Sequence, residues 1–65
     1  MRVVINGDQV EIEHEELTLV LERLGYQANK VVVAVNETFV ARDHWDVFKL
    51  SAGDRLDVLG RLEGG

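Results

Sequence analysis

The sequence predicts an α+β fold, in which one helix packs on a mixed sheet of four to five strands. Three observations support this prediction: alternating apolar residues flank a tight-turn signal, one segment has helical spacing of its apolar residues, and a run of valines indicates an interior strand. A helix and a sheet of this size can each bury one apolar face against the other. We therefore expect a single domain over residues 1–65.

The first two strands are predicted on either side of Asn6-Gly7. Apolar residues recur at every second position in residues 1–5 and again from Val10 to Ile12. Asparagine and glycine both tolerate the positive φ angles that a tight hairpin turn requires. The pattern therefore predicts a β-hairpin.

A short amphipathic helix follows, because apolar residues recur at helical spacing at Leu17, Val20, Leu21 and Leu24. Thr18 is the predicted N-cap, since its hydroxyl can accept a hydrogen bond from a free backbone N–H group. Gly25 is predicted to end the helix in a left-handed conformation.

The continuous run from Val31 to Val35 predicts a strand that is buried on both faces and is therefore central in the sheet. Asn36-Glu37 is predicted to turn the chain into a partner strand over residues 38–41. Because Glu37 lacks the conformational freedom of glycine, the sequence favours a loop longer than two residues here.

The last part of the chain is predicted to contain a short turn, in which Asp43 is the cap and Trp45 partly covers the core. A second turn at residues 52–54 leads to a final strand over residues 55–62. One face of that strand carries Leu56, Val58, Gly60 and Leu62, and the other carries Arg55, Asp57, Leu59 and Arg61. This order of elements is that of a β-grasp fold.

The composition argues against several functional classes. Twelve acidic and seven basic residues give a net charge of -5, which disfavours binding to nucleic acid or to an anionic membrane surface. No apolar run has the length of a membrane span and no secretion signal is evident, so we expect a cytoplasmic protein. With 65 residues, no nucleophile–base pair and no phosphate-binding loop, the chain is not expected to be an enzyme.

The chain has no cysteine, which excludes disulfides, thiolate zinc sites and an internal persulfide. His14 and His44 each lie near acidic residues, but no third ligand has a spacing typical of a metal site. We therefore expect two surface histidines and no bound metal.

Several short motifs are spread over essentially the whole chain: Thr18-Leu19, Leu21, Leu24-Gly25, Val35-Asn36, Val40-Ala41-Arg42, Trp45, Gly53-Asp54 and the terminal Gly64-Gly65. Their order and spacing resemble the ThiS family, the sulfur carriers of thiamine biosynthesis. The resemblance implies a ubiquitin-like β-grasp fold with a flexible C-terminal Gly-Gly tail. Two turn positions depart from the family pattern: Glu37 replaces a common glycine, and Ala41 replaces a frequent proline.

The resemblance also implies the function. In the family, an E1-like adenylating enzyme uses ATP and magnesium to activate the C-terminal carboxylate, and a donor such as a cysteine desulfurase system supplies sulfur. The resulting thiocarboxylate passes its sulfur to thiazole synthase. By position, Gly65 is the adenylation and thiocarboxylate site, Gly64 gives access to it, and residues 63–65 are the reactive tail. The carrier itself binds no cofactor.

The chemistry explains why activation and terminal glycines are needed. An α-carboxyl group has a reference pKa of about 3.3 to 3.7, so it is ionised at neutral pH and resists a sulfur nucleophile until it is activated. Gly64 and Gly65 lack a Cβ atom, which lets the tail enter a narrow site. Because the chain has no cysteine, its terminus is the place for transferable sulfur.

Leu59 stands among charged residues just before the tail, and together with Arg61 and Leu62 it forms a candidate partner-contact face. A single exposed leucine is also common on ordinary surfaces, and the sequence favours neither interpretation. We expect a monomer when free, with the edge of the last strand and the tail at the partner interface.

Three alternative functions remain open on the sequence. The first is that the chain is a sister carrier that feeds molybdopterin or another sulfur pathway. Gly65 is also suited to an isopeptide bond with a lysine, as in ubiquitin-like modifiers. A binding module with an inert terminus is the third alternative.

Overall fold

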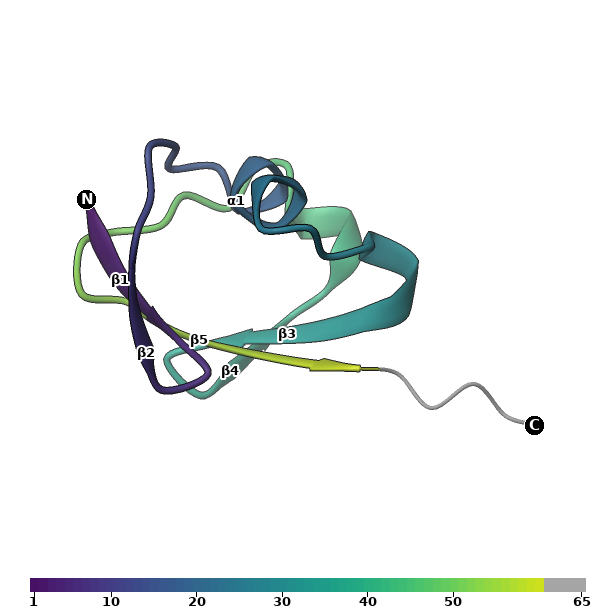
Figure 1. The fold of residues 1–65 in the computed structure, drawn as a ribbon. Coiled ribbons are helices and arrows are strands. Elements are labelled where there is room, and N and C mark those ends of the chain that lie inside the picture. The colour runs from purple at the N-terminus through teal and green to yellow at the C-terminus, as the bar shows by residue number, and fades with distance from the viewer. Residues whose placement is uncertain (61–65) are drawn as a thin grey trace.

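A computed structural model describes residues 1–60 of the chain (Figure 1). The elements are β1 (Arg2–Ile5), β2 (Asp8–Glu11), α1 (Leu17–Arg23), the 3-10 helix η1 (Ala28–Lys30), β3 (Val31–Val35), β4 (Thr38–Val40), the 3-10 helix η2 (Arg42–His44) and β5 (Arg55–Gly60). The five strands form one sheet in the order β2-β1-β5-β3-β4. Among the strands of the described region only the β1–β5 pair is parallel, so the sheet is mixed.

The predicted α+β architecture is confirmed, since α1 lies across one face of the mixed sheet (Figure 1). The predicted flexible tail falls outside the described residues. None of the helices within residues 1–60 combines the length and the apolar character that a membrane crossing needs.

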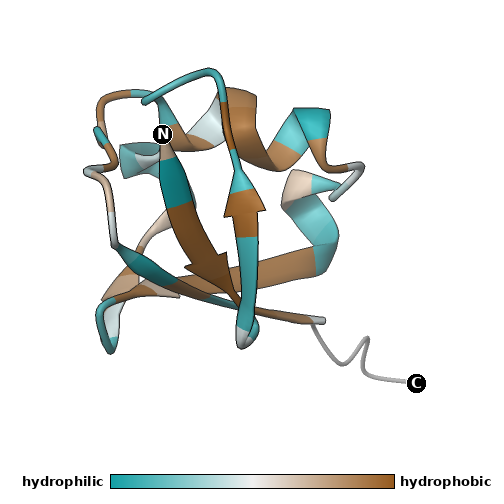
Figure 2. Cartoon of the chain, turned by 60° about the vertical axis from the view of Figure 1, so that its left-hand side comes forward, coloured by the Kyte–Doolittle hydropathy of each residue, from teal (hydrophilic) through white to brown (hydrophobic). Residues whose placement is uncertain are grey.

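The core lies between α1 and the sheet. Its most deeply buried side chains come from three strands and the helix, and they are Val3, Leu17, Leu21, Val33 and Leu56. Figure 2 shows that hydrophobic residues are concentrated in β1, β3 and α1, which enclose this core. Because side chains alternate along a strand, β1, β3 and β5 each turn one apolar row toward the core and the other row outward.

Asn6-Gly7 forms the predicted two-residue hairpin turn. Ile5 pairs with Asp8, which leaves only these two residues in the loop. Their φ angles are 50° and 87°, in the left-handed region that a tight hairpin turn uses. This prediction is confirmed in both its position and its physical cause.

The second hairpin differs from the prediction, because its loop also has only two residues. Val35 pairs with Thr38, and Asn36 and Glu37 have φ angles of 51° and 70°. Glu37 therefore takes a left-handed conformation that is unfavourable for a residue with a Cβ atom. Its Oε1 atom accepts a hydrogen bond of 3.2 Å from Arg55 Nη2, on an exposed surface.

The helix begins without the predicted cap. The N-cap is Glu16, which makes no side-chain capping bond, and Thr18 lies inside the first turn. A neighbouring segment supplies the missing acceptor instead, since Leu17 N donates to the Phe48 carbonyl at 3.1 Å. The C-terminal prediction is confirmed, because Gly25 has a φ angle of 89°.

Two predictions for the segment after β4 are wrong. Asp43 does not cap η2, whose N-cap is Ala41 and has no side-chain capping bond. Trp45 is 3% exposed and so belongs to the core, where its indole N–H group donates to the Val40 carbonyl at 3.0 Å. This hydrogen bond removes the cost of burying the indole nitrogen.

β3 is interior but is not buried on both faces. Val33 and Val35 are buried on the helix side, whereas Val32 and Ala34 on the other side are only half-buried. The central strand is β5, which lies between β1 and β3. The expectation that an edge of the last strand is free for partners is therefore wrong for residues 55–58, where both edges have hydrogen-bond partners.

We predict that Glu37→Gly stabilises the protein. Glycine removes the left-handed strain, a gain of about 1 kcal/mol, and loses only an exposed ion pair with Arg55. Urea unfolding measures the change. Glu37→Ala is the matched control, because it also removes the carboxylate but keeps the Cβ atom. A glycine variant that is no more stable than the alanine variant would contradict this account.

Candidate functional site

The candidate site begins at β5, the strand that leads toward the C-terminal residues. Gly60 is the last residue of β5 and of the described region. The predicted roles of Arg61, Leu62, Gly64 and Gly65, and of the tail over residues 63–65, lie outside the described residues and stay predictions. The structure therefore bears on how β5 is held and on what surrounds its end.

On one side, β5 is held by β1 and by the turn that follows it. Val4 N donates to the Asp54 carbonyl and Asn6 N to the Leu56 carbonyl, both at 2.9 Å. Beyond that point the Asn6 side chain continues the pairing: Val58 N donates to its Oδ1 atom at 2.8 Å, and its Nδ2 atom donates to the Val58 carbonyl at 3.2 Å. The side-chain amide thus acts as one further peptide group of β1.

On the other side, β5 pairs with β3 from Leu56, opposite Val35, to Gly60, opposite Val31. The turn residue Asn36 extends this pairing. Its backbone N–H group donates to the Arg55 carbonyl at 2.7 Å, and its Oδ1 atom accepts from Arg55 N at 3.0 Å. Each hairpin turn therefore uses its asparagine to hold the same strand.

The outer face of the sheet, away from α1, carries an apolar strip beside the end of β5. Leu59 is 62% exposed and Phe39 is 66% exposed. Leu59 pairs with Val32 and Phe39 pairs with Ala34, so the two half-buried β3 residues lie between them. We call Leu59, Val32, Ala34 and Phe39 the outer strip.

Leu59 was one of the predicted partner-contact residues, and the structure places it in an apolar strip rather than alone. Phe39 was missed by the sequence reasoning. Its signal was the alternation in β4, where buried Val40 requires its neighbour Phe39 to face outward. Phe39 lies on β4 and Leu59 lies on β5, the two strands that flank β3. The pairing register that places both residues beside β3 could not be predicted from the sequence.

The two histidines differ in their exposure. His44 is exposed and its Nδ1 atom lies 3.3 Å from Asp43 Oδ1, whereas His14 is half-buried. Within residues 1–60 there is no group of three or more side chains suited to hold a metal ion.

A comparison with protein families now bears on this site. A model of the ThiS family matches residues 3–65, so the matched region includes the terminal Gly64-Gly65. The chain belongs to the ThiS family. A search of the curated proteins gives no significant match.

Solved structures support this membership. The chain is similar to the crystal structure of the thiamine biosynthesis protein ThiS from Geobacter metallireducens, with a TM-score of 0.83 and 28% identity over 100% of both chains. It is also similar to the NMR solution structure of a thiamine biosynthesis protein from the same organism. That match has a TM-score of 0.77 and 28% identity, and it covers 100% of this chain and 88% of the other. The β-grasp fold of this ThiS family member is thus shared with these proteins.

We predict that Asn6→Asp weakens the attachment of β5. The second carboxylate oxygen would face the Val58 carbonyl in place of a donor, which should lower the free energy of unfolding by about 1–3 kcal/mol. Aspartate tolerates the left-handed conformation as asparagine does, so the turn itself is preserved. Amide hydrogen exchange should become faster at Val58.

The matched control is Gln9→Glu, which adds the same charge to an exposed position of the same hairpin. Its stability should change by less than about 0.5 kcal/mol. Equal effects of the two substitutions would show that charge, and not the Asn6 bridge, is responsible.

Proposed function

We propose that this chain is a sulfur carrier of thiamine biosynthesis, with the carboxylate of Gly65 as its working group. The observation that carries the proposal is the match to the ThiS family, which reaches the last residue of the chain. The two similar structures, both of thiamine biosynthesis proteins, support the pathway. The absence of cysteine leaves the C-terminus as the position for carried sulfur.

The proposed reaction has two steps. A carboxylate oxygen of Gly65 attacks the α-phosphorus of ATP, pyrophosphate leaves, and an acyl adenylate forms. A hydrosulfide ion supplied by the sulfur donor then attacks the acyl carbon, AMP leaves with its oxygen, and loss of the proton on sulfur gives the thiocarboxylate. Magnesium neutralises the phosphate charges in the first step, and both ATP and magnesium belong to the adenylating partner.

In this proposal the carrier provides the reactive carboxylate and a docking surface, and the partner enzymes provide catalysis. The partners are an E1-like adenylating enzyme, a sulfur donor such as a cysteine desulfurase system, and thiazole synthase, which receives the sulfur. The carrier is a cytoplasmic monomer when free and binds no cofactor. The five residues after Gly60 can extend at most about 18 Å, so the carrier body must dock close to each partner's active site.

The outer strip is the surface that we propose for this docking. It is apolar, it is exposed at both ends, and it includes Leu59, the residue that precedes Gly60. A partner that covers this strip would hold β5 next to its own active site, with Arg61 and Leu62 continuing the contact. An apolar patch of the partner is the complementary surface, because Val32 and Ala34 at the centre of the strip offer no charge.

The proposal is tested by intact mass spectrometry after incubation with ATP, magnesium, the adenylating enzyme and a sulfur source. We expect a mass increase equal to the difference between sulfur and oxygen, and its loss when Gly65 is deleted. No increase, with an enzyme that is active on another carrier, would contradict the proposal. Lysine-linked adducts that resist thiol reagents would instead indicate a protein modifier.

The docking surface is tested with Leu59→Asp. The introduced carboxylate should raise the KM of the adenylating enzyme for the carrier by roughly tenfold or more, with little change in kcat, because it disturbs binding and not the transferred group. Val47→Asp is the matched control, since Val47 is 68% exposed but lies outside the outer strip. Equal effects of both substitutions, or a change in kcat alone, would argue against docking through this strip.

A further inference from the structure

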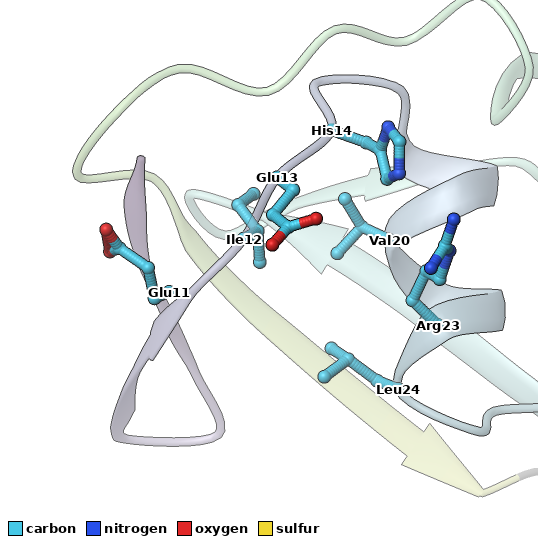
Figure 3. Close-up of a pocket in the computed structure, with 7 residues that line it drawn as sticks. All are labelled: Glu11, Ile12, Glu13, His14, Val20, Arg23 and Leu24. Atoms are coloured by element: carbon cyan, nitrogen blue, oxygen red, sulfur yellow. The ribbon is translucent and has the colours of Figure 1, made fainter.

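A groove separates β2 and its following segment from the helix α1. It has a volume of about 320 Å³, and its lining residues are Glu11, Ile12, Glu13, His14, Val20, Arg23 and Leu24. Figure 3 shows Glu13 and His14 of the strand segment on the side of the helix residues Val20 and Arg23, whereas the Glu11 side chain points away from the helix. Leu24, which is 41% exposed, provides apolar surface at the open side. None of these residues belongs to the outer strip.

The strand wall of the groove is also an edge of the sheet, because among residues 1–60 β2 pairs with β1 alone. Met1 and Ile12 exchange backbone hydrogen bonds of 2.8 Å in both directions. In an antiparallel pair such residues alternate with residues whose N–H and C=O groups point away from the partner strand. Gln9 and Glu11 therefore present free backbone donors and acceptors at the edge beside the groove.

We infer that this edge and groove form a second interaction surface, which binds an extended peptide segment of a partner protein by adding it to β2 as a sixth strand. Backbone hydrogen bonds to Gln9 and Glu11 would supply the pairing. Alternate side chains of the peptide would enter the groove and pack on the exposed Leu24, above the buried Val20, so these positions are apolar.

The charge of the surrounding residues determines which side chains the peptide carries between its apolar positions. Residues 8–16 contain five acidic residues, Asp8, Glu11, Glu13, Glu15 and Glu16, and no lysine or arginine. The ion pair between Glu11 and Arg2 has a separation of 3.8 Å and both side chains are 67% exposed, so an incoming cation can replace Arg2 at little cost. The peptide therefore carries lysine or arginine at the positions between its apolar residues.

The same charge argues against a second copy of the chain as the occupant. Two β2 edges brought together would oppose their acidic residues, and the whole chain carries a net charge of -5. Acidic residues on an edge strand are a known protection against self-pairing. A basic segment of another protein meets no such repulsion.

The surface is separate from the site around β5. Arg2, which pairs with Glu11, accepts a backbone hydrogen bond of 2.8 Å from Gly53, just before β5 begins, whereas Leu59 and Gly60 end that strand. The strand wall of the groove at Glu11 therefore lies toward the opposite end of the sheet from Gly60. A peptide in the groove leaves the outer strip accessible, so this inference does not depend on the proposed function.

The test uses the full chain labelled with ¹⁵N and the blocked peptide Lys-Val-Lys-Val-Lys-Val-Lys, followed by NMR titration. We expect shifts at Gln9, Glu11 and Leu24 and slower hydrogen exchange at the Gln9 and Glu11 amides. The corresponding peptide with glutamate in place of lysine should bind at least about tenfold more weakly. Shifts centred on β4 or on the outer strip, or no binding at millimolar peptide, would overturn the inference.

Two further measurements separate strand addition from charge attraction alone. Peptides N-methylated at every valine or at every lysine block opposite edges of the added strand, so one should lose binding and the other should retain it. Leu24→Ser should weaken binding, whereas Leu59→Ser should leave it unchanged. If both methylated peptides bind equally, or if Leu24→Ser has no effect, the peptide does not bind as a strand in this groove.

Discussion

The structure depends on the hydrogen bonding that holds β5 at the centre of the sheet. β5 is the last strand in the chain, yet it joins the β1–β2 hairpin to the β3–β4 hairpin. Without β5, each hairpin would be a two-stranded ribbon, which is marginally stable alone. Its inward residues Leu56 and Val58 also complete the core under α1. The sheet and the core are therefore complete only when residues 55–60 pair between β1 and β3.

Asn6 and Asn36 connect local turn formation to this long-range pairing. Both have positive φ angles, which explains why asparagine suits the turns. Both also direct a side-chain amide to β5, at Val58 and at Arg55 respectively. A glycine at either position could adopt the positive φ angle of the turn, but it could not make the side-chain hydrogen bonds to β5. The same residue type is thus required twice, once by backbone conformation and once by hydrogen bonding.

The sequence predicted the elements and the Asn6-Gly7 turn because those signals are local. It failed where a distant segment supplies the missing interaction. Thr18 is not the cap because the Phe48 carbonyl reaches the helix start, and Glu37 fits a two-residue loop beside Arg55. The likeness to a known family predicts the site at Gly65, which lies outside the described residues, whereas finding Phe39 needed the strand register, which no local pattern contains.

The register of β5 links stability to the proposed carrier chemistry. Its residues alternate between the core, with Leu56 and Val58, and the outer face, with Asp57 and Leu59. A slip of one residue would place Asp57 in the core and Val58 outside, and would move the chain end by about 3.3 Å. The bonds from Asn6 to both backbone groups of Val58 oppose that slip. The interactions that protect the core therefore also fix the position of Gly60, the residue from which the proposed carrier tail would start.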